Sequence, residues 1–235
     1  MAQVIHFSSD PPQSPFAPQW DYVIAEKETK VDVEELAKLI LSKEEEIKEK
    51  YPDDWDHYDD GDTGLGADSL TARFNYFNVL DWDSPACKEL HKEIKDFHDL
   101  YVQNTVASPE AGDIGISHQY YDSPFFKEGG ELKVRCWANV MRKGQQIKEH
   151  SHSSFPHSYL SGHFTVQCDN TETVYHHPYH QQTYPFKNIP NVMTLFPTWV
   201  PHSTTVHESD TPRITIAFDI LLHNTSKSDG ELVTL

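Results

Sequence analysis

The sequence predicts a mostly β fold, a double-stranded β-helix (jelly roll) backed by α-helices. Three observations predict it: two amphipathic helical segments lie in the first half, short strands of alternating polarity follow Pro124, and no strand-helix repeat appears among them. A chain of 235 residues fits one domain of this kind. We expect an N-terminal arm with supporting helices at 1–130, the β core at 131–223 and a tail at 224–235.

Two segments have the apolar spacing of amphipathic helices. In residues 31–51, apolar side chains recur at helical spacing, Asp32 is a suitable N-cap, and the charged run 43–46 is expected to be a solvated face. A second helix is expected to begin with Ser84 as its N-cap and Pro85 at its first position. Its apolar stripe predicts that it lies on a sheet.

The other segments are interpreted from their turn-forming residues and their periodicity. Residues 1–20 contain several prolines and are expected to form an irregular arm. Residues 53–69 are expected to be a solvated loop, because they lack the glutamate that closes an EF-hand calcium loop. Alternation over 132–141 predicts a half-buried strand. Residues 171–188 have no clear period and are expected to be a long insertion near the mouth of a site.

A pair of histidines is the first candidate for chemistry. His150 and His152 are separated by one residue, so in an extended segment both side chains point to the same side and form a metal clamp. His202 follows the apolar run 192–196 and offers a third imidazole. The chain has fifteen histidines, so the pair alone is a weak signal that needs support from other residues.

An arginine supplies that support. Arg213 opens a strand in which Arg213 and Thr215 share one face, while Ile214, Ile216 and Phe218 share the other. A guanidinium beside a hydroxyl is a receptor for a carboxylate. The simpler alternative is a surface salt bridge, but a core strand has no packing reason to open with an inward arginine.

These residues stand in an order found in a known family. The order is Trp137-x-Asn139, His150-x-His152, Ser161-Gly162, Phe196-Pro197-x-Trp199-x-x-His202 and Arg213-x-Thr215. In this order the chain resembles the Fe(II)- and 2-oxoglutarate-dependent oxygenase superfamily. More narrowly, it resembles a branch of oxygenases found in bacteria and their phages. The resemblance covers residues 137–220 well and the N-terminal half only loosely.

The resemblance implies a metal centre and a cosubstrate. The implied Fe(2+) ligands are His150, His152 and His202, with no catalytic residue beyond the metal centre. The implied cosubstrate is 2-oxoglutarate, with its distal carboxylate held by Arg213 and Thr215 and its near carboxylate by Asn139. The implied reaction decarboxylates 2-oxoglutarate to succinate and hydroxylates an unidentified small-molecule or peptide substrate.

The chain departs from the family at one ligand position. Most members have aspartate or glutamate where this chain has His152, so the set contributes no negative charge. Glu149 and Asp169 are nearby in sequence, but Glu149 points away from His150 on a regular strand. Two hypotheses stay open: three histidine ligands, or two histidines completed by water.

Two other functions stay open at this stage. A metal-dependent cupin-type enzyme without 2-oxoglutarate is loosely indicated, although His157 and Trp199 occupy positions where cupin motifs want glutamate and glycine. A non-catalytic jelly-roll module that binds a ligand or protein is the other alternative. Arg213 and Thr215 favour the oxygenase, since cupins need no such receptor.

Composition limits the partners and the compartment. A formal charge of −18 argues against nucleic acid and against an anionic membrane surface. No apolar run is long enough for a membrane helix, and the N-terminus lacks the features of a secretory leader, so a cytoplasmic protein is expected. The three cysteines show no Cys-x-x-Cys spacing, and Cys136 and Cys168 are expected to be buried thiols. His163 is expected to be a polar interior residue.

Overall fold

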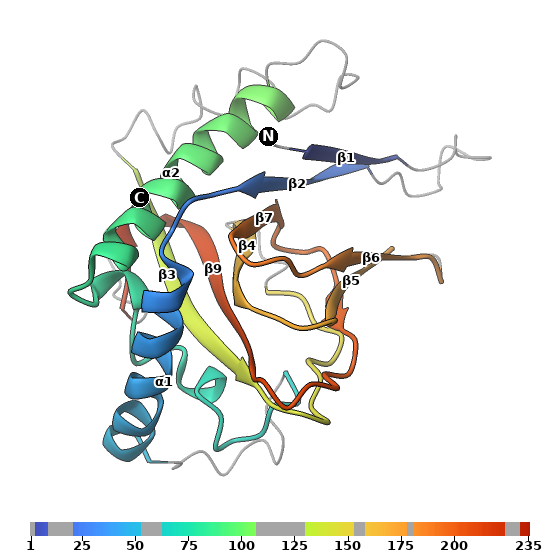
Figure 1. Ribbon diagram of the computed structural model, residues 1–235. Coiled ribbons are helices and arrows are strands. Elements are labelled where there is room, and N and C mark those ends of the chain that lie inside the picture. Colours follow the sequence, from blue (N-terminus) through green and yellow to red (C-terminus); the bar gives the residue numbers. More distant parts are fainter. Residues whose placement is uncertain are drawn as a thin grey trace.

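The molecule has three layers: two α-helices, a large β-sheet and a small β-sheet. The computed structural model describes residues 3–8, 21–52, 63–106, 130–152, 158–177, 181–223 and 231–235. Figure 1 shows α1 (Val33–Lys50) and α2 (Pro85–Val106) on one side of the large sheet. The hairpin of β5 (Glu172–His176) and β6 (Thr183–Lys187) lies on the other side.

Both sheets are antiparallel. The remaining strands are β1 (Gln3–Ser8), β2 (Asp21–Glu28), β3 (Glu131–Met141), β4 (Ser158–Gln167), β7 (Val192–Pro197), β8 (His202–Thr204), β9 (Arg213–His223) and β10 (Val233–Thr234). The large sheet has the order β1-β2-β7-β4-β9-β3-β10 and the small sheet the order β6-β5-β8. From β3 to β9 the chain crosses back and forth between the two sheets. This two-sheeted roll is the jelly roll that the sequence predicts.

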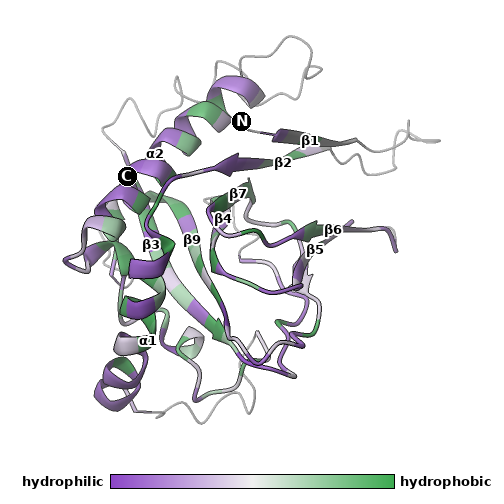
Figure 2. Cartoon of the chain, in the orientation of Figure 1, coloured by the Kyte–Doolittle hydropathy of each residue, from purple (hydrophilic) through white to green (hydrophobic). Residues whose placement is uncertain are grey.

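Both predicted helices form with their predicted caps. The backbone N–H of Glu35 donates to the Asp32 carboxylate at 2.9 Å, and that of Ala86 donates to the Ser84 hydroxyl at 3.1 Å. Figure 2 shows hydrophobic and hydrophilic residues alternating along both helices, as expected of helices with one face on the core. Two 3₁₀ helices, η1 (Thr71–Arg73) and η2 (Val79–Asp81), lie between them. No described helix is both long and apolar enough to span a membrane.

The neighbouring strands β3 and β9 have one apolar face and one face of mixed, largely polar character. They pair in register along their whole length, so their side chains alternate between the helix layer and the small sheet. The face toward the helices is buried and carries Val134, Cys136, Ala138, Val140, Ile214, Ile216, Phe218 and Ile220. The face toward the small sheet carries Arg135, Trp137, Asn139, Arg213, Thr215, Ala217 and Asp219.

Close packing on the apolar face requires a glycine in β4. Gly162 lies opposite Phe218 of β9. A side-chain carbon at Gly162 would collide with the Phe218 ring and with the backbone carbonyl oxygen of Thr194. The glycine of the Ser161-Gly162 pair therefore has a packing role.

Two stretches predicted to be irregular form strands. Within the predicted arm, residues 3–8 form an edge strand paired with β2, while residues 9–20 lie outside the described part of the chain. The predicted insertion at 171–188 is wrong as well, because β5 and β6 pair there as a hairpin. The buried positions of β5 are Thr173 and Tyr175, which do not give the apolar alternation expected of a strand.

Three predictions of exposure are also wrong. The strand β3 is not half-buried, because residues 136–141 are buried on both faces. Glu44, in the run predicted to be solvated, is 4% exposed and accepts two hydrogen bonds from Arg142. Cys136 is buried as predicted, but Cys168 is only half-buried.

The end of the predicted solvated loop packs onto the core. Residues 53–62, which hold most of its acidic side chains, lie outside the described residues. Leu65, however, is 6% exposed and clusters with Met141 and Ile147. Residues 63–69 therefore cover part of the β3 face that points away from the helices.

Candidate metal centre

His150 and His152 lie in an extended segment that follows β3. The chain reverses at Gly144, whose φ of 83° favours glycine. The backbone N–H of His150 donates to the His202 carbonyl at 3.0 Å, and the N–H of His202 donates back at 2.9 Å. The N–H of His152 donates to the Thr198 carbonyl at 3.0 Å. These bonds join the histidine segment to β8 and to the turn before it.

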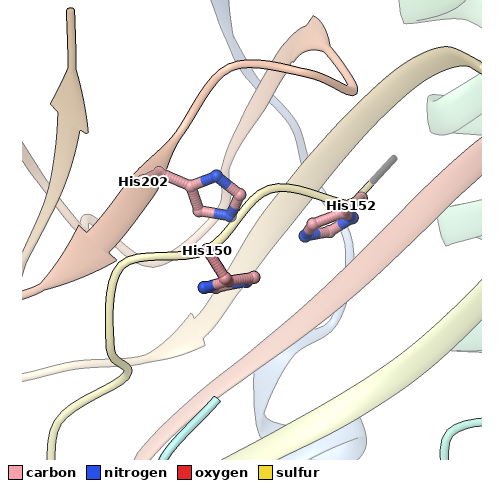
Figure 3. Close-up of side chains that lie close together, drawn as sticks. All are labelled: His150, His152 and His202. Atoms are coloured by element: carbon pink, nitrogen blue, oxygen red, sulfur yellow. The ribbon is translucent and has the colours of Figure 1, made fainter. Parts of the chain in front are cut away.

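The three candidate ligands meet in one place. The ligand nitrogens of His150, His152 and His202 all lie within 4.8 Å of one another. Figure 3 shows the three rings gathered together, two from the extended segment and one from β8. The ring centroids are 4.4 Å apart for His150 and His202, and 5.1 Å apart for His152 and His202. Within the described ranges this is the sole group of three or more side chains suited to a metal ion.

Hydrogen bonds at the Nδ1 atoms orient the three rings. His150 and His202 each pair through Nδ1 with the backbone carbonyl two residues earlier, at 2.8 and 3.0 Å. The Nδ1 of His152 pairs with the carboxylate of Asp219 at 2.5 Å. Because carbonyl and carboxylate oxygens accept, each Nδ1 donates and each Nε2 carries the ring's lone pair. This is the tautomer that binds a metal through Nε2.

His202 is held in its neutral form. It is 8% exposed, and burial, together with the proximity of His150 and His152, places its pKa well below the ordinary value. A neutral imidazole is the form that binds a metal ion. The residue His150 is half-buried, so the group is accessible on its side.

The carboxylate that contacts the histidines comes from β9. Glu149 and Asp169, the acidic residues near the histidines in sequence, are both exposed. Asp219 instead bonds to His152 across the inside of the roll. Burial raises the pKa of Asp219, but the attraction of His152 and the bonds that the carboxylate accepts outweigh burial, so the pKa is lowered. Asp219 is therefore ionised at neutral pH.

Arg213 and Thr215 lie beside the histidines. With Asn139 they line a cavity of about 50 Å³ that all three imidazoles also line. Arg213 is 2% exposed, its Nη1 lies 3.3 Å from the Thr215 hydroxyl, and its Nε has no hydrogen-bond partner among the described residues. Burial lowers the pKa of Arg213 to about 10, so it stays charged at neutral pH. This is a buried cation suited to an anionic ligand.

Two more polar side chains line the same cavity. The amide oxygen of Asn139 accepts a hydrogen bond from the Thr71 hydroxyl at 2.7 Å. His163 lines the cavity and lies 2.8 Å from the Thr194 hydroxyl through Nδ1. Burial, reinforced by the charge of Arg213, lowers the pKa of His163 to about 3. The ring is therefore a neutral polar group at the cavity wall.

A larger cleft adjoins the histidines. It has a volume of about 600 Å³, within the range of small-molecule sites. The cleft and the inner cavity share Thr63, Trp137, His150 and His152. Its aromatic and basic lining residues include Tyr51, Phe74, Tyr76, Trp137, Lys50, Arg73 and Arg135. The inner cavity and the cleft therefore meet at the candidate ligands.

Solved structures similar to this chain are mostly 2-oxoglutarate and iron(II) oxygenases. A Pseudomonas putida prolyl-4-hydroxylase has 10% identity and a TM-score of 0.49, over 81% of this chain and 82% of that one. A 2OG-Fe(II) oxygenase family member from Burkholderia pseudomallei has 20% identity and a TM-score of 0.37, over 57% and 60%. EvdO2 from Micromonospora carbonacea var. aurantiaca, complexed with 2-oxoglutarate, has 15% identity and a TM-score of 0.35, over 57% and 68%.

The likeness stops at this level. No family model and no curated protein matches the chain. The chain spans 60% of the length of the Burkholderia protein. At TM-scores below 0.5 these similarities carry no argument about function, which rests on the side chains of the site.

The six site residues predicted from the sequence lie around one cavity, but the sequence analysis missed Asp219. His150, His152, His202, Arg213, Thr215 and Asn139 all line it. The position of Asp219 was available in the sequence, because it shares the strand parity of Arg213 and Thr215. His163, predicted to be a polar interior residue, is one, and it lies at the wall of the same cavity.

Proposed function

We propose that this chain is an Fe(2+)- and 2-oxoglutarate-dependent dioxygenase that hydroxylates a small-molecule or peptide substrate. The observation that carries the proposal is a single cavity that holds both a three-imidazole cluster and the buried guanidinium of Arg213. A metal enzyme of the cupin type needs the first of these features but not the second. The proposal includes a cytoplasmic setting, to which three free thiols are suited.

The residues fit a metal ion and a diacid. The histidines present three ring nitrogens within 4.8 Å of one another, and a cation held by them would keep other positions for cosubstrate and oxygen. Arg213 and Thr215 would hold the distal carboxylate, and Asn139 the near one.

Iron(II) and 2-oxoglutarate, when bound, would supply with dioxygen an oxidative decarboxylation that forms succinate and carbon dioxide, with one oxygen atom going to succinate and the other to the substrate. The chain's contribution is binding and exclusion of water. Arg213 would hold the cosubstrate at one end of the cavity, and the histidines would hold the cation at the other. The cleft of about 600 Å³ would place the primary substrate against His150 and His152.

The test is an anaerobic titration with iron(II) and 2-oxoglutarate. The wild-type chain is expected to develop the weak visible metal-to-ligand band of their chelate, and to form succinate when air is admitted. Arg213→Met is expected to bind iron(II) as before, but 2-oxoglutarate at least about 100-fold more weakly, because a charge-assisted fork of hydrogen bonds is lost. Arg213→Lys, which keeps the charge without the fork, should fall between the two.

Arg142→Lys is the matched control, since the exposed Arg142 pairs with Glu44 of α1 and lies outside both cavities. It should behave as wild type. A wild-type chain that binds iron(II) but gives neither the band nor succinate would overturn the oxygenase proposal and favour the cupin-type function. Equal 2-oxoglutarate affinity in Arg213→Met and Arg142→Lys would remove Arg213 from its role.

A further inference from the structure

Three neighbouring strands bring an acidic, a basic and a hydroxyl side chain together beside His152. Asp219 of β9 lies directly opposite Arg135 of β3 and directly opposite Ser161 of β4. Residues directly opposite one another on paired strands point to the same face. The register of the large sheet therefore sets Asp219 between a cation and a hydroxyl, on the face that lines the roll.

The contacts of Asp219 are short and converge on one oxygen. The Ser161 hydroxyl donates to Oδ1 of Asp219 at 2.6 Å, and Nδ1 of His152 donates to the same oxygen at 2.5 Å. The side chains of His152 and Asp219 are 8% and 13% exposed. A mostly buried, charge-assisted bond of this length is among the stronger hydrogen bonds in proteins.

The three histidines differ in what holds them. His150 and His202 bond through Nδ1 to neutral backbone carbonyls, whereas His152 alone bonds to a carboxylate. A carboxylate behind an imidazole raises the electron density on its other nitrogen and makes it a better metal ligand.

We propose that Asp219 is a positioning residue of the metal centre, which holds the His152 ring with Nε2 toward the cation and returns to the site the negative charge that three histidines lack. The inference rests on the proposed function only in requiring a metal at the histidines. Ser161 keeps the carboxylate in place through its hydrogen bond. Arg135 adds a positive charge on the opposite side.

The inference is tested with cobalt(II) alone, which needs neither 2-oxoglutarate nor turnover. Asp219→Asn keeps an acceptor oxygen but removes the charge. It is expected to stay folded, to bind cobalt(II) about 10- to 100-fold more weakly than wild type and to shift the visible cobalt spectrum. Glu44→Gln is the matched control, because Glu44 is another buried carboxylate paired with an arginine, away from the histidines. It should keep the wild-type affinity and spectrum.

A double-mutant cycle separates positioning from general structural damage. If Asp219 acts through His152, then Asp219→Asn should weaken cobalt binding no further in a His152→Ala background. Additive losses, or an Asp219→Asn variant that matches Glu44→Gln in affinity and spectrum, would overturn the inference. Should Asp219→Asn fail to fold, Ser161→Ala provides the second test, with a smaller loss in the same direction and again no added loss in His152→Ala.

Failure of the two proposals can be told apart. A wild-type chain that does not bind cobalt(II) through the histidines overturns both. A chain that binds cobalt(II) and passes the cycle, but forms no succinate with iron(II) and 2-oxoglutarate, overturns the oxygenase and leaves the role of Asp219 standing. If the wild-type chain forms succinate but the variants fail the double-mutant cycle, the oxygenase proposal stands and the role of Asp219 is overturned.

Discussion

The two faces of β3 and β9 are made from alternate residues of the same two strands, and they differ in composition. Toward the helices, Ile214, Ile216 and Phe218 are fully buried and join the main hydrophobic core. Toward the small sheet, Arg213 and Thr215 are equally buried but polar, and they line a cavity. Burial alone therefore does not distinguish the faces. What distinguishes them is whether each buried group finds a partner within the chain.

The comparison separates the face that stabilises the fold from the face that is suited to bind a ligand. The apolar face gains free energy from packing, since each large side chain removed from water contributes roughly 1.5–3 kcal/mol. The polar face holds a guanidinium whose Nε is unpartnered among the described residues, which opposes folding unless a ligand is bound. Changes on the first face should affect unfolding, and changes on the second should affect binding.

The largest stability effect is expected on the apolar face. Phe218 is fully buried against Gly162, so Phe218→Ala should lower the free energy of unfolding by about 3–5 kcal/mol through lost contact and a cavity. Urea unfolding measures the loss. Cobalt(II) affinity of the folded variant, measured without denaturant, should change less than about 2-fold. A large loss of metal affinity with little loss of stability would break the distinction between the faces.

A smaller effect is expected from acid on the polar face. His163 has a pKa lowered to about 3, so the unfolded chain takes up its proton first as the pH falls below about 6.5. The contribution of the neutral ring to the free energy of unfolding is therefore fully present above that pH and is lost as the pH falls toward 3. At pH 5 the loss should be about 2 kcal/mol relative to pH 7.5. His163→Gln should lack this part of the acid sensitivity in urea unfolding, whereas His91→Gln on α2 should keep it.

The smallest effect is expected in the helix layer. Asp32→Ala removes the cap of α1 and should cost about 1 kcal/mol in urea unfolding, while Asp32→Asn should cost little because asparagine caps equally well. Neither variant should change cobalt(II) affinity, since Asp32 lines neither the inner cavity nor the cleft beside the histidines. A change in metal affinity with Asp32→Ala would show that the helix layer does more than cover the apolar face.

The sequence predicted the parts of the fold in which polarity alternates regularly or a capping residue marks the start of a helix. Strand β9 alternates strictly, so its two faces and the place of Arg213 were evident. Both helices have caps in sequence, at Asp32 and Ser84, and both form where predicted. The β5–β6 hairpin was hidden because its inward side chains, Thr173 and Tyr175, are not aliphatic.

Tertiary partners account for the rest. Nothing near Glu44 in sequence shows that Arg142, contributed by the turn after β3, covers it. The bond from His152 to Asp219 joins residues 67 positions apart, and it follows only from the rolled topology. The sequence therefore identified the side chains that line the cavity better than it identified which of them touch.

The unbroken pairing of β3 with β9 also fixes the distance between Arg213 and Asp219. Arg213 and Asp219 are 219 − 213 = 6 positions apart on one strand, an even number, so they face the same way at a separation of about 20 Å along the backbone. Arg213, the proposed anion receptor, and Asp219, the carboxylate bonded to His152, therefore lie on one continuous strand with no hinge or loop between them. Inserting a single residue between them would turn one of the two to the helix side, so the spacing admits changes only in steps of two.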